Sequence, residues 1–492
     1  MSAPDVPEPS YEDLAALVVG LVARVEALEV ENAELRRRVG MDSTNSSTPP
    51  SKDSIGAKAR RRADRSSRER SADRKRGGQP GHQGSGLAPS VTPDRTETVS
   101  APVGCACGAD LIGAADAGMG WSQLWDIPPI ALEKVHYLLP RRRCGCCGKI
   151  TTAVPPFGMA GTVAYGPNIN AAAILLASEG NVPIERTAVL MAMMVGAPVS
   201  AGFVARALER FAQRLEACGF DDAMKQALRA EDVLCADETP TNVISKNTDE
   251  HGHPMPGAAH AVTVRTPDAR LVWYAAMGSR SKTAIAALGV LEGYPGYLVR
   301  DDYAGWHQYD PQLAGVQQCA AHLIRHAKGV LELHPTQQKW ADEVITVLRE
   351  AAAAVATAQG HDQLDPTLLA DLRQRYDQAV RWGIITNRHR GWAKGNHPGY
   401  NLATRLADKA DQVWTFTRNL AVPWTNNSSE QALKSPKRHQ AVSGYWHTLT
   451  TLAHYCRARS YLISARNHGV RPIDAIHNAL TGNPWLPALA NT

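Results

Sequence analysis

Residues 11–39 repeat an apolar pattern every seven positions. Two positions of the repeat are apolar with a single exception: Leu14, Leu21, Leu28 and Leu35 at one, and Val18, Val25, Asn32 and Val39 at the other. Leucine at d with β-branched residues at a favours a two-stranded parallel coiled coil, and a lone asparagine at a fixes its register. We therefore predict a dimerisation helix over residues 1–40 that makes the protein a homodimer. The alternative is an amphipathic helix that docks on its own chain.

Between residues 41 and 95 the apolar positions nearly vanish, and serine, threonine, proline, glycine and arginine dominate. Such a composition cannot build a core, so we predict a disordered linker. The whole chain has a net charge of only +5, yet residues 58–76 hold ten lysines and arginines against three acidic residues. Cations concentrated in this way release counterions from a phosphate backbone, which predicts a DNA-binding arm rather than a solvated spacer. The cations expected to contact DNA are Arg60, Arg61, Arg62, Arg74, Lys75 and Arg76.

The second half of the chain alternates short apolar runs with helical patterns. The predicted strands are residues 231–243, 260–265, 271–277 and 296–301, with a helix at 281–291 and mostly helical sequence over 335–420. Three neighbouring strands, a helix and a further strand predict a mixed sheet flanked by helices. Upstream, residues 167–216 are helical with a break at 196–200, after which Ser200 is expected to cap a second helix. This pattern fits a helix-turn-helix that reads DNA, and it equally fits a plain helical bundle.

Five of the nine cysteines fall in two groups, Cys105-Ala-Cys107 and Cys144-Gly-Cys-Cys147. Two cysteine pairs separated by a short strand-rich segment predict a four-cysteine zinc ribbon, with structural Zn²⁺ held by Cys105, Cys107, Cys144 and Cys147. Cys146 is an alternative ligand, and knuckles without metal are the other possibility. Because we find no signal-peptide pattern and no apolar run long enough to span a membrane, we expect a cytosolic protein.

Three acidic residues stand in distinctive surroundings. Asp237 lies in Ala236-Asp-Glu-Thr-Pro240, Asp301 in Asp301-Asp-Tyr-Ala-Gly-Trp306, and Glu430 in Asn426-Asn-Ser-Ser-Glu-Gln-Ala-Leu-Lys434. The first two acids close apolar runs, and the third opens a helical segment. Carboxylates brought together from distant points of a chain repel each other unless cations lie between them. A pair of Mg²⁺ or Mn²⁺ ions is the usual solution, and it indicates phosphoryl transfer, often on nucleic acid.

These three segments resemble the catalytic motifs of the IS66 family of bacterial transposases, which belong to the DDE class. The resemblance implies an RNase H-like core in which Asp237, Asp301 and Glu430 bind the catalytic metal ions. Gln431 and Ser429 stand where the family usually has arginine and alanine. In the zinc-binding region, the family's first cysteine is replaced by glycine.

The resemblance also implies roles for residues around the acids. Cys319-Ala-Ala-His322 resembles a C-x-x-H motif of the family. We expect His322 to contact phosphate or orient a ligand, with a buried structural histidine as the alternative. Lys434 and Lys437 are expected to face the DNA phosphate, although Pro436 can end the helix before Lys437. Glu238 and Asp302, next to the presumed ligands, are the likeliest residues to be confused with them.

The patterns together predict a multidomain α+β protein. Its parts are a coiled coil (1–40), a basic linker (41–95), a zinc-ribbon-like domain (96–155), a helical domain (156–228), an RNase H-like mixed α/β core (229–470) with a helical insertion at about 327–422, and a tail (471–492). The function expected is Mg²⁺-dependent cleavage and strand transfer at the ends of a mobile DNA element, with companion proteins encoded by the element as possible partners. The alternatives are a DNA-binding regulator that has lost catalysis and a metal-dependent nuclease without strand transfer.

Overall fold

The computed structural model describes residues 10–46, 48, 53–58, 87–155, 161–248, 254–358 and 363–488. Contacts within the chain define two units, one made of residues 1–59 and 133–492 and the other of residues 60–132. The helices and strands named below all belong to the first unit, which is of mixed α and β structure. Among the described helices, none has the length and apolar character that crossing a bilayer requires.

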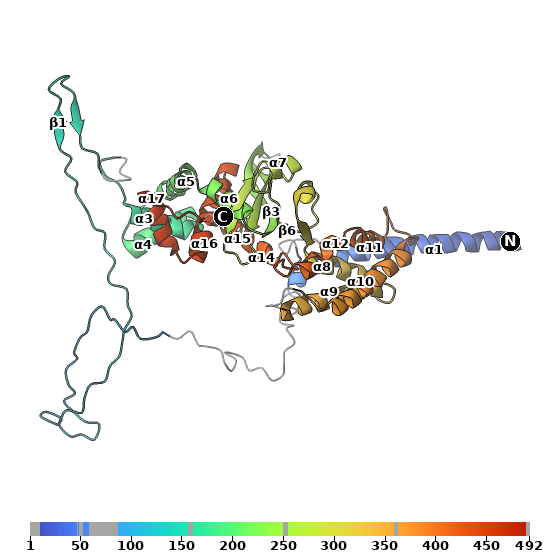
Figure 1. Ribbon diagram of the computed structural model, residues 1–492, viewed down its shortest axis with the longest axis horizontal. Coiled ribbons are helices and arrows are strands. Elements are labelled where there is room, and N and C mark those ends of the chain that lie inside the picture. Colours follow the sequence, from blue (N-terminus) through green and yellow to red (C-terminus); the bar gives the residue numbers. More distant parts are fainter. Residues whose placement is uncertain are drawn as a thin grey trace, which may run out of the picture. The chain divides into compact units, whose positions relative to one another are not determined.

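A five-stranded mixed sheet lies at the centre of the first unit (Figure 1). Its strands are β3 (Val233–Thr248), β4 (Pro254–Arg265), β5 (Val272–Met277), β6 (Tyr297–Arg300) and β7 (Gly315–Gln318), in the order β5-β4-β3-β6-β7. β4 runs antiparallel to β3 and β5, whereas β3, β6 and β7 run parallel to one another. The four strands predicted from the sequence are confirmed. β7 is a fifth strand, which its Gly-Val-Gln-Gln sequence did not indicate.

Side chains on β3 alternate between the two faces of the sheet. Leu234 and Ala236 join one apolar cluster. Cys235 joins another cluster on the opposite face. If the alternation continues, Asp237 belongs to the face of Cys235 and Glu238 to the face of Ala236. The two neighbouring acids therefore have different surroundings.

Helices from both ends of the unit cover the face of Leu234. They are α3 (Pro167–Ser178), α5 (Ala201–Ala217), α6 (Phe220–Arg229), α16 (Leu449–Asn467) and α17 (Pro472–Thr481), with the short α7 (Lys282–Ala286) beside them and α4 (Ile184–Val195) packed on α3 and α5. The Ser200 hydroxyl accepts a hydrogen bond from the Phe203 backbone N–H at 3.1 Å, so the predicted N-cap of α5 is confirmed. The sequence predicted two helices here, but the structure has three. The chain turns after α3 at Asn181, which has a left-handed φ of 52°.

A helical insertion covers the opposite face. It consists of α8 (Ala320–Leu333), α9 (Lys339–Thr357), α10 (Pro366–Asn387), α11 (Pro398–Asp408), α12 (Ala410–Val413) and α13 (Thr415–Arg418). Its apolar core includes Trp340, Tyr376 and Trp414 and is continuous with Cys235 and Val299 of the sheet. α9 and α10 lie side by side (Figure 1). The insertion and this face of the sheet therefore share one core.

Two short helices carry the third acidic segment. α14 (Asn427–Ala432) includes Glu430, and α15 (Lys434–Ser443) begins after Leu433. Pro436 lies in the first turn of α15, where a helix needs no backbone N–H from it. The helix expected to continue from Glu430 is thus interrupted before Lys434.

α1 (Tyr11–Gly40) is a single helix of 30 residues. Its a and d side chains are exposed, including Leu21 at 53% and Leu28 at 54%. Val30, at position f, lies close to Gly391 of the insertion, 3.7 Å from the place a Cβ on that glycine would take. At Leu21 and Leu28 the apolar stripe of α1 is therefore exposed, whereas Asn32, further along at position a, lines a cleft between α1 and the insertion.

The residues after α1 form a hydrogen-bonded turn that packs on α8. The Ser43 hydroxyl donates to Asp53 Oδ2 at 2.7 Å, and both residues are buried. The Asn45 side-chain amide donates to Glu332, and the Asn45 backbone carbonyl oxygen lies 2.2 Å from the place that a Cβ on Gly329 would take. This part of the predicted linker is therefore held against α8 by specific contacts.

A small antiparallel hairpin is formed by β1 (Arg141–Arg143) and β2 (Ile150–Thr152). Its connecting turn is closed by the Cys144 N–H, which donates to the Lys149 carbonyl at 2.8 Å, and by the Gly148 N–H, which donates to the Cys144 carbonyl at 2.9 Å. The turn therefore holds the second cysteine group in one compact loop.

Gly383 on α10 faces the buried Trp340 ring of α9, so the substitution Gly383→Ala tests this packing. A Cβ at this position would lie 2.5 Å from the ring. Alanine normally stabilises a helix by up to about 1 kcal/mol relative to glycine. We expect instead a net loss of about 1–3 kcal/mol in the free energy of unfolding, measured by urea denaturation, because the fully buried ring cannot move aside. Gly20→Ala is the control, since no atom lies within 4 Å of its Cβ position. Equal stability of the two variants would contradict the packing.

Candidate active site

Asp237 and Asp301 lie at the same end of two parallel strands. The register of β3 and β6 pairs Cys235 with Val299, so two residues further along Asp237 is level with Asp301. Each carboxylate is oriented by a backbone amide. The Glu238 N–H donates to Asp237 Oδ1 and the Tyr303 N–H donates to Asp301 Oδ1, both at 2.9 Å. Parallel pairing therefore brings together two acids that are far apart in the sequence.

The segment of Glu430 is fastened to β3 by Asn426, the residue before α14. The Asn426 side-chain amide donates to the Ala236 carbonyl at 2.7 Å, and its backbone N–H donates to Cys319 Sγ at 3.1 Å. Burial raises the pKa of the Cys319 thiol to about 11, so at neutral pH it stays protonated and accepts this bond as a neutral group. These two bonds place α14 beside the strand that carries Asp237.

The other acids affect the carboxyl of Asp237, a half-buried residue. Burial raises the pKa of this carboxyl well above its usual value, and the charges of Glu238, Asp301 and Glu430 raise it further. The pKa of Lys437 is lowered by burial, while Asp237 and Glu430 act in the opposite direction. The three predicted acids and Lys437 therefore share one electrostatic environment.

Glu238 is neutralised on the other face of the sheet. Arg280 Nε donates to Glu238 Oε1 at 2.8 Å, and Trp306 Nε1 donates to Oε2 at 2.7 Å. Burial still raises the pKa of Glu238, and the Asp301 charge adds to this, but Arg280 opposes both. The carboxylate of Glu238 is thus held by partners within the protein.

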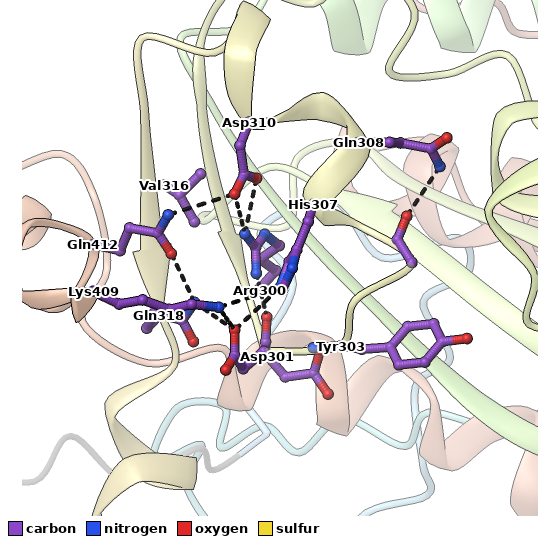
Figure 2. A network of polar contacts seen from close by, with 12 residues as sticks. Arg300, Asp301, Tyr303, His307, Gln308, Asp310, Val316, Gln318, Lys409 and Gln412 are labelled. Atoms are coloured by element: carbon purple, nitrogen blue, oxygen red, sulfur yellow. Dashed lines mark hydrogen bonds and ion pairs between the residues drawn. The ribbon is translucent and has the colours of Figure 1, made fainter. Parts of the chain in front are cut away.

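Asp302 is held in a similar way by the insertion. The Lys409 ammonium, from the junction of α11 and α12, bonds Asp302 Oδ1, and Gln318 Nε2 and His307 Nε2 each lie 3.1 Å from the same oxygen. Figure 2 shows Lys409, Gln318 and His307 directed toward the acidic loop after β6. Burial alone would raise the pKa of Asp302, but Lys409, Arg405 and Gln318 together outweigh it and the pKa is lowered.

The loop that carries Asp301 and Asp302 is also held by Arg300, whose side chain is fully buried. Its guanidinium donates to both oxygens of Asp310 at 2.8 Å and to the Asp301 carbonyl at 2.8 Å (Figure 2). The backbone that carries Asp301 is therefore fixed independently of the Asp301 carboxylate.

Cations are distributed unequally among these acids. In the part of the chain that the structure describes, Glu238 and Asp302 have cationic partners, whereas neither Asp237 nor Asp301 forms an ion pair. Two carboxylates at one site without a cation favour binding of a positively charged ligand. This difference separates Asp237 and Asp301 from the adjacent acids that sequence reasoning could have confused with them.

Glu430 differs from the other two acids because Arg325 holds it. Arg325 Nη2 donates to Glu430 Oε1 at 2.9 Å, and His322 Nε2 lies 3.5 Å from the same oxygen. Burial, aided by the Arg325 charge, lowers the pKa of His322 to about 4 although Glu430 opposes this, so the ring is uncharged at neutral pH. Sequence reasoning named His322 but missed Arg325. Its spacing of three residues from His322 on a helix was the available signal.

The remaining predicted DNA contacts have different placements. Lys434 is exposed at the start of α15. Arg60, Arg61, Arg62, Arg74, Lys75 and Arg76 lie outside the described residues. Among the residues that are described, no group of three or more His, Cys, Asp or Glu side chains is arranged so as to hold a metal ion.

The four predicted zinc ligands form two local pairs, all exposed. Backbone amides near Ala109 and the Cys105 side chain lower the pKa of Cys107. Amides of Cys147 and Cys146 likewise lower the pKa of Cys144, together with the Cys147 side chain. Within each pair, then, the loop brings one thiol toward the other and favours its thiolate form.

Two family models match different parts of the chain. Residues 162–453 match the model described as "Transposase IS66 family", a span that includes the whole sheet, the insertion and all three acids. The chain belongs to the IS66 transposase family. Membership makes it a nucleic-acid-processing enzyme whose partner is DNA. Residues 1–88 match a second model, described as a family of unknown function (DUF6444). No curated protein matches the chain.

The charges around this IS66 site predict opposite effects for Asp237→Asn and Asp302→Asn on stability in metal-free buffer. The folded-state pKa of Asp237 is raised above 3.8, so the cost of its ionisation appears as the pH rises above that value. Removing the charge should raise the free energy of unfolding at pH 7.5, and the gain should shrink toward pH 4.

The folded-state pKa of Asp302 is lowered below 3.8, so its stabilising contribution is present at neutral pH and is lost only as the pH falls through that lowered value. Asp302→Asn should therefore cost about 1–3 kcal/mol at pH 7.5. Denaturation in EDTA between pH 4.5 and 8 measures both variants. Shifts of the same sign would contradict the charge distribution.

Proposed function

We propose that this IS66 family member is a DDE transposase that cleaves the ends of a DNA element and joins them to a target, using Asp237, Asp301 and Glu430. One observation carries the proposal. Asp237 and Asp301 stand at the ends of adjacent parallel strands and form no ion pair among the described residues, while Glu238 and Asp302 are each paired with a cation of the protein. A site with this charge suits divalent cations and the phosphate groups that accompany them.

The sheet supports an RNase H-like core for the catalytic domain. Its central strand β3 pairs antiparallel with β4 on one side and parallel with β6 on the other. For that fold we expected three neighbouring strands, a helix and then a parallel strand, and β7 adds a second parallel strand beside β6. The first two acids lie at the ends of the parallel pair, and Glu430 lies on a helix that follows the insertion.

Asp237, Asp301 and Glu430 would hold two Mg²⁺ or Mn²⁺ ions, which when bound activate the attacking hydroxyl and stabilise the leaving oxygen. The donor set fits such ions because all three groups are carboxylates and Asp237 is destabilised by its neighbours. Glu430 must leave Arg325 to join the others. Arg325 is then free to contact the phosphate, together with Lys437, which already faces the acids. The uncharged His322 orients Glu430 in both states.

For the cysteine pairs we propose a structural Zn²⁺ held by Cys105, Cys107, Cys144 and Cys147. The lowered pKa of Cys107 and of Cys144 supports thiolate ligands. α4 and α5, joined at Gly196, remain our candidates for a helix-turn-helix contact with DNA. The basic segment that contains Arg60 and Arg74 would add sequence-independent affinity.

Asp237→Asn tests the catalytic proposal. We expect Mg²⁺-dependent cleavage of labelled element-end DNA to disappear while DNA affinity, measured by gel shift, is unchanged. Mg²⁺ should also raise the melting temperature of the native protein and have a much smaller effect on the variant, because a ligand that binds the folded state stabilises it. Asp268→Asn, at the exposed β4–β5 turn, is the matched control and should cleave normally.

The products distinguish the remaining functions. With a target plasmid present, joined DNA indicates a transposase, cut DNA alone indicates a nuclease, and bound but uncut DNA indicates a regulator. Cleavage by Asp237→Asn at the native rate would disprove the assignment of the acids.

We also propose that α1 forms the predicted parallel homodimer. The d side chains Leu21 and Leu28 and the a side chain Val25 are more than half exposed, so a large apolar stripe lacks cover from the described chain. The alternative, docking of this stripe on the chain's own helices, is disfavoured because Val30 at position f makes the contact with the insertion. The opposite side of the helix is left for a second copy.

Leu21→Glu should convert the dimer to a monomer, because a buried charge at d of a coiled coil is unpaired. Sedimentation of the full chain gives the molecular mass. Val19→Glu is the control, since Val19 is also exposed (70%) but lies at the outward position b. A monomeric native protein, or identical masses of the two variants, would refute dimerisation through this stripe.

A further inference from the structure

A wide cleft separates the last turns of α1 from α8 and α11. Its volume is about 1510 Å³, and its walls include Arg36 of α1, His326 of α8, Trp392 and Lys394 of the segment before α11, and Arg405 of α11. Small-molecule pockets usually enclose about 300–1,000 Å³. The size and the open form of this cleft suit a section of a polymer better than a compact ligand.

The walls of the cleft offer hydrogen-bond donors and positive charge. Lys394 and Arg36 are exposed, and neither pairs with an acid among the described residues. Asn396 and Asn401 add exposed side-chain amides. Two acids also line the cleft. One of them, Glu332, already accepts a hydrogen bond from Asn45. Cations and amides around a half-buried tryptophan are typical of surfaces that bind a nucleic-acid backbone.

The cleft begins next to the catalytic acids. His326 lies one helical turn, about 6 Å, beyond His322 on α8. Arg405 Nη2 donates to His326 Nδ1 at 2.7 Å, and Arg405 Nη1 lies 3.8 Å from Asp302 Oδ2. A single guanidinium thus borders both the cleft and the loop that carries Asp301. A strand leaving the acids along α8 would enter the cleft directly.

The N-terminal segment forms one end of the cleft. Asn45 and Ser46 line it, and the Asn45 carbonyl fits against α8 only because residue 329 is glycine. This close approach joins α1 to the catalytic unit through contacts between backbones. The wall formed by α1 is therefore positioned by the fold.

We propose that this cleft binds the phosphate backbone of DNA next to the cleavage site, with Lys394, Asn396 and Asn401 as contacts. The inference rests on DNA cleavage at the acids described above. It adds a second DNA surface, formed by the N-terminal helix and the helical insertion together. Arg405 connects the two surfaces, so DNA bound in the cleft would affect the loop that carries Asp301.

The double variant Lys394→Glu with Asn401→Asp tests the cleft in the full-length protein. Binding of a labelled 30-base-pair duplex is measured in EDTA between 50 and 300 mM salt, so the result does not depend on catalysis. We expect affinity to fall about tenfold at 150 mM salt. The slope of log affinity against log salt should fall by about 1, because one phosphate contact is lost. The control, Lys339→Glu with Gln374→Glu, makes the same change in charge at exposed sites outside the cleft.

A photo-reactive side chain at Asn396 should crosslink to the duplex, whereas one at Gln374 should not. Equal salt slopes for the two double variants, or no crosslink from position 396, would overturn the proposal. So would a change of molecular mass in the cleft variant without a change in DNA affinity, since this would assign the cleft to a second copy of the chain. If Asp237→Asn still cleaves DNA but the cleft results hold, the catalytic assignment fails and the binding surface stands.

Discussion

Repulsion between neighbouring, partly buried carboxylates is the interaction on which the structure around the acids depends. Asp237, Glu238, Asp301, Asp302 and Glu430 lie near one another, and a cluster of this charge is stable only if most of its members have cationic partners. Arg280 forms an ion pair with Glu238, Lys409 with Asp302 and Arg325 with Glu430. Within the described part of the chain, Asp237 and Asp301 form no ion pair. The distribution of cations thus determines where a positively charged ligand is most favourable.

The helical insertion supplies most of this compensation. α8 carries His322 and Arg325 to Glu430, and Lys409 reaches Asp302 from the end of α11. The same helices share an apolar core with the sheet, so their cations are held by packing rather than by the ion pairs themselves. An insertion long enough for several helices is therefore an integral part of the site, and its outer side forms the cleft that continues from it.

One side of α1 contacts the insertion, and the other is the side proposed to bind a second copy of the chain. Near the end of the helix, Val30 contacts the insertion, while the leucines at d stay exposed along most of its length. A helix that docks with one side can still form a coiled coil with the other. The turn after α1 fastens this arrangement to α8 through Asn45 and Gly329, which joins the proposed dimer interface to the catalytic unit.

The sequence by itself determined much of this protein. Alternating apolar runs located four of the five strands, the heptads located α1, and three short motifs singled out Asp237, Asp301 and Glu430. Such signals are local, because they depend on periodicity and on neighbouring residues. β7 was not predicted because two of its four residues, Gln317 and Gln318, are polar and therefore give no apolar run. They are buried nevertheless, since their hydrogen-bond partners, such as Val413, come from distant segments.

Only the tertiary structure shows that these acids and their neighbours have different partners. Asp237 and Glu238 are adjacent in the sequence, and so are Asp301 and Asp302, but strand pleating and the insertion give each member of a pair different partners. Arg325 and Lys409 become part of the site only when the chain folds, since Arg325 is more than a hundred residues from Glu430 and Lys409 is more than a hundred from Asp302. Which carboxylates remain without a cation depends on distances across the fold, and no pattern along the chain encodes those distances.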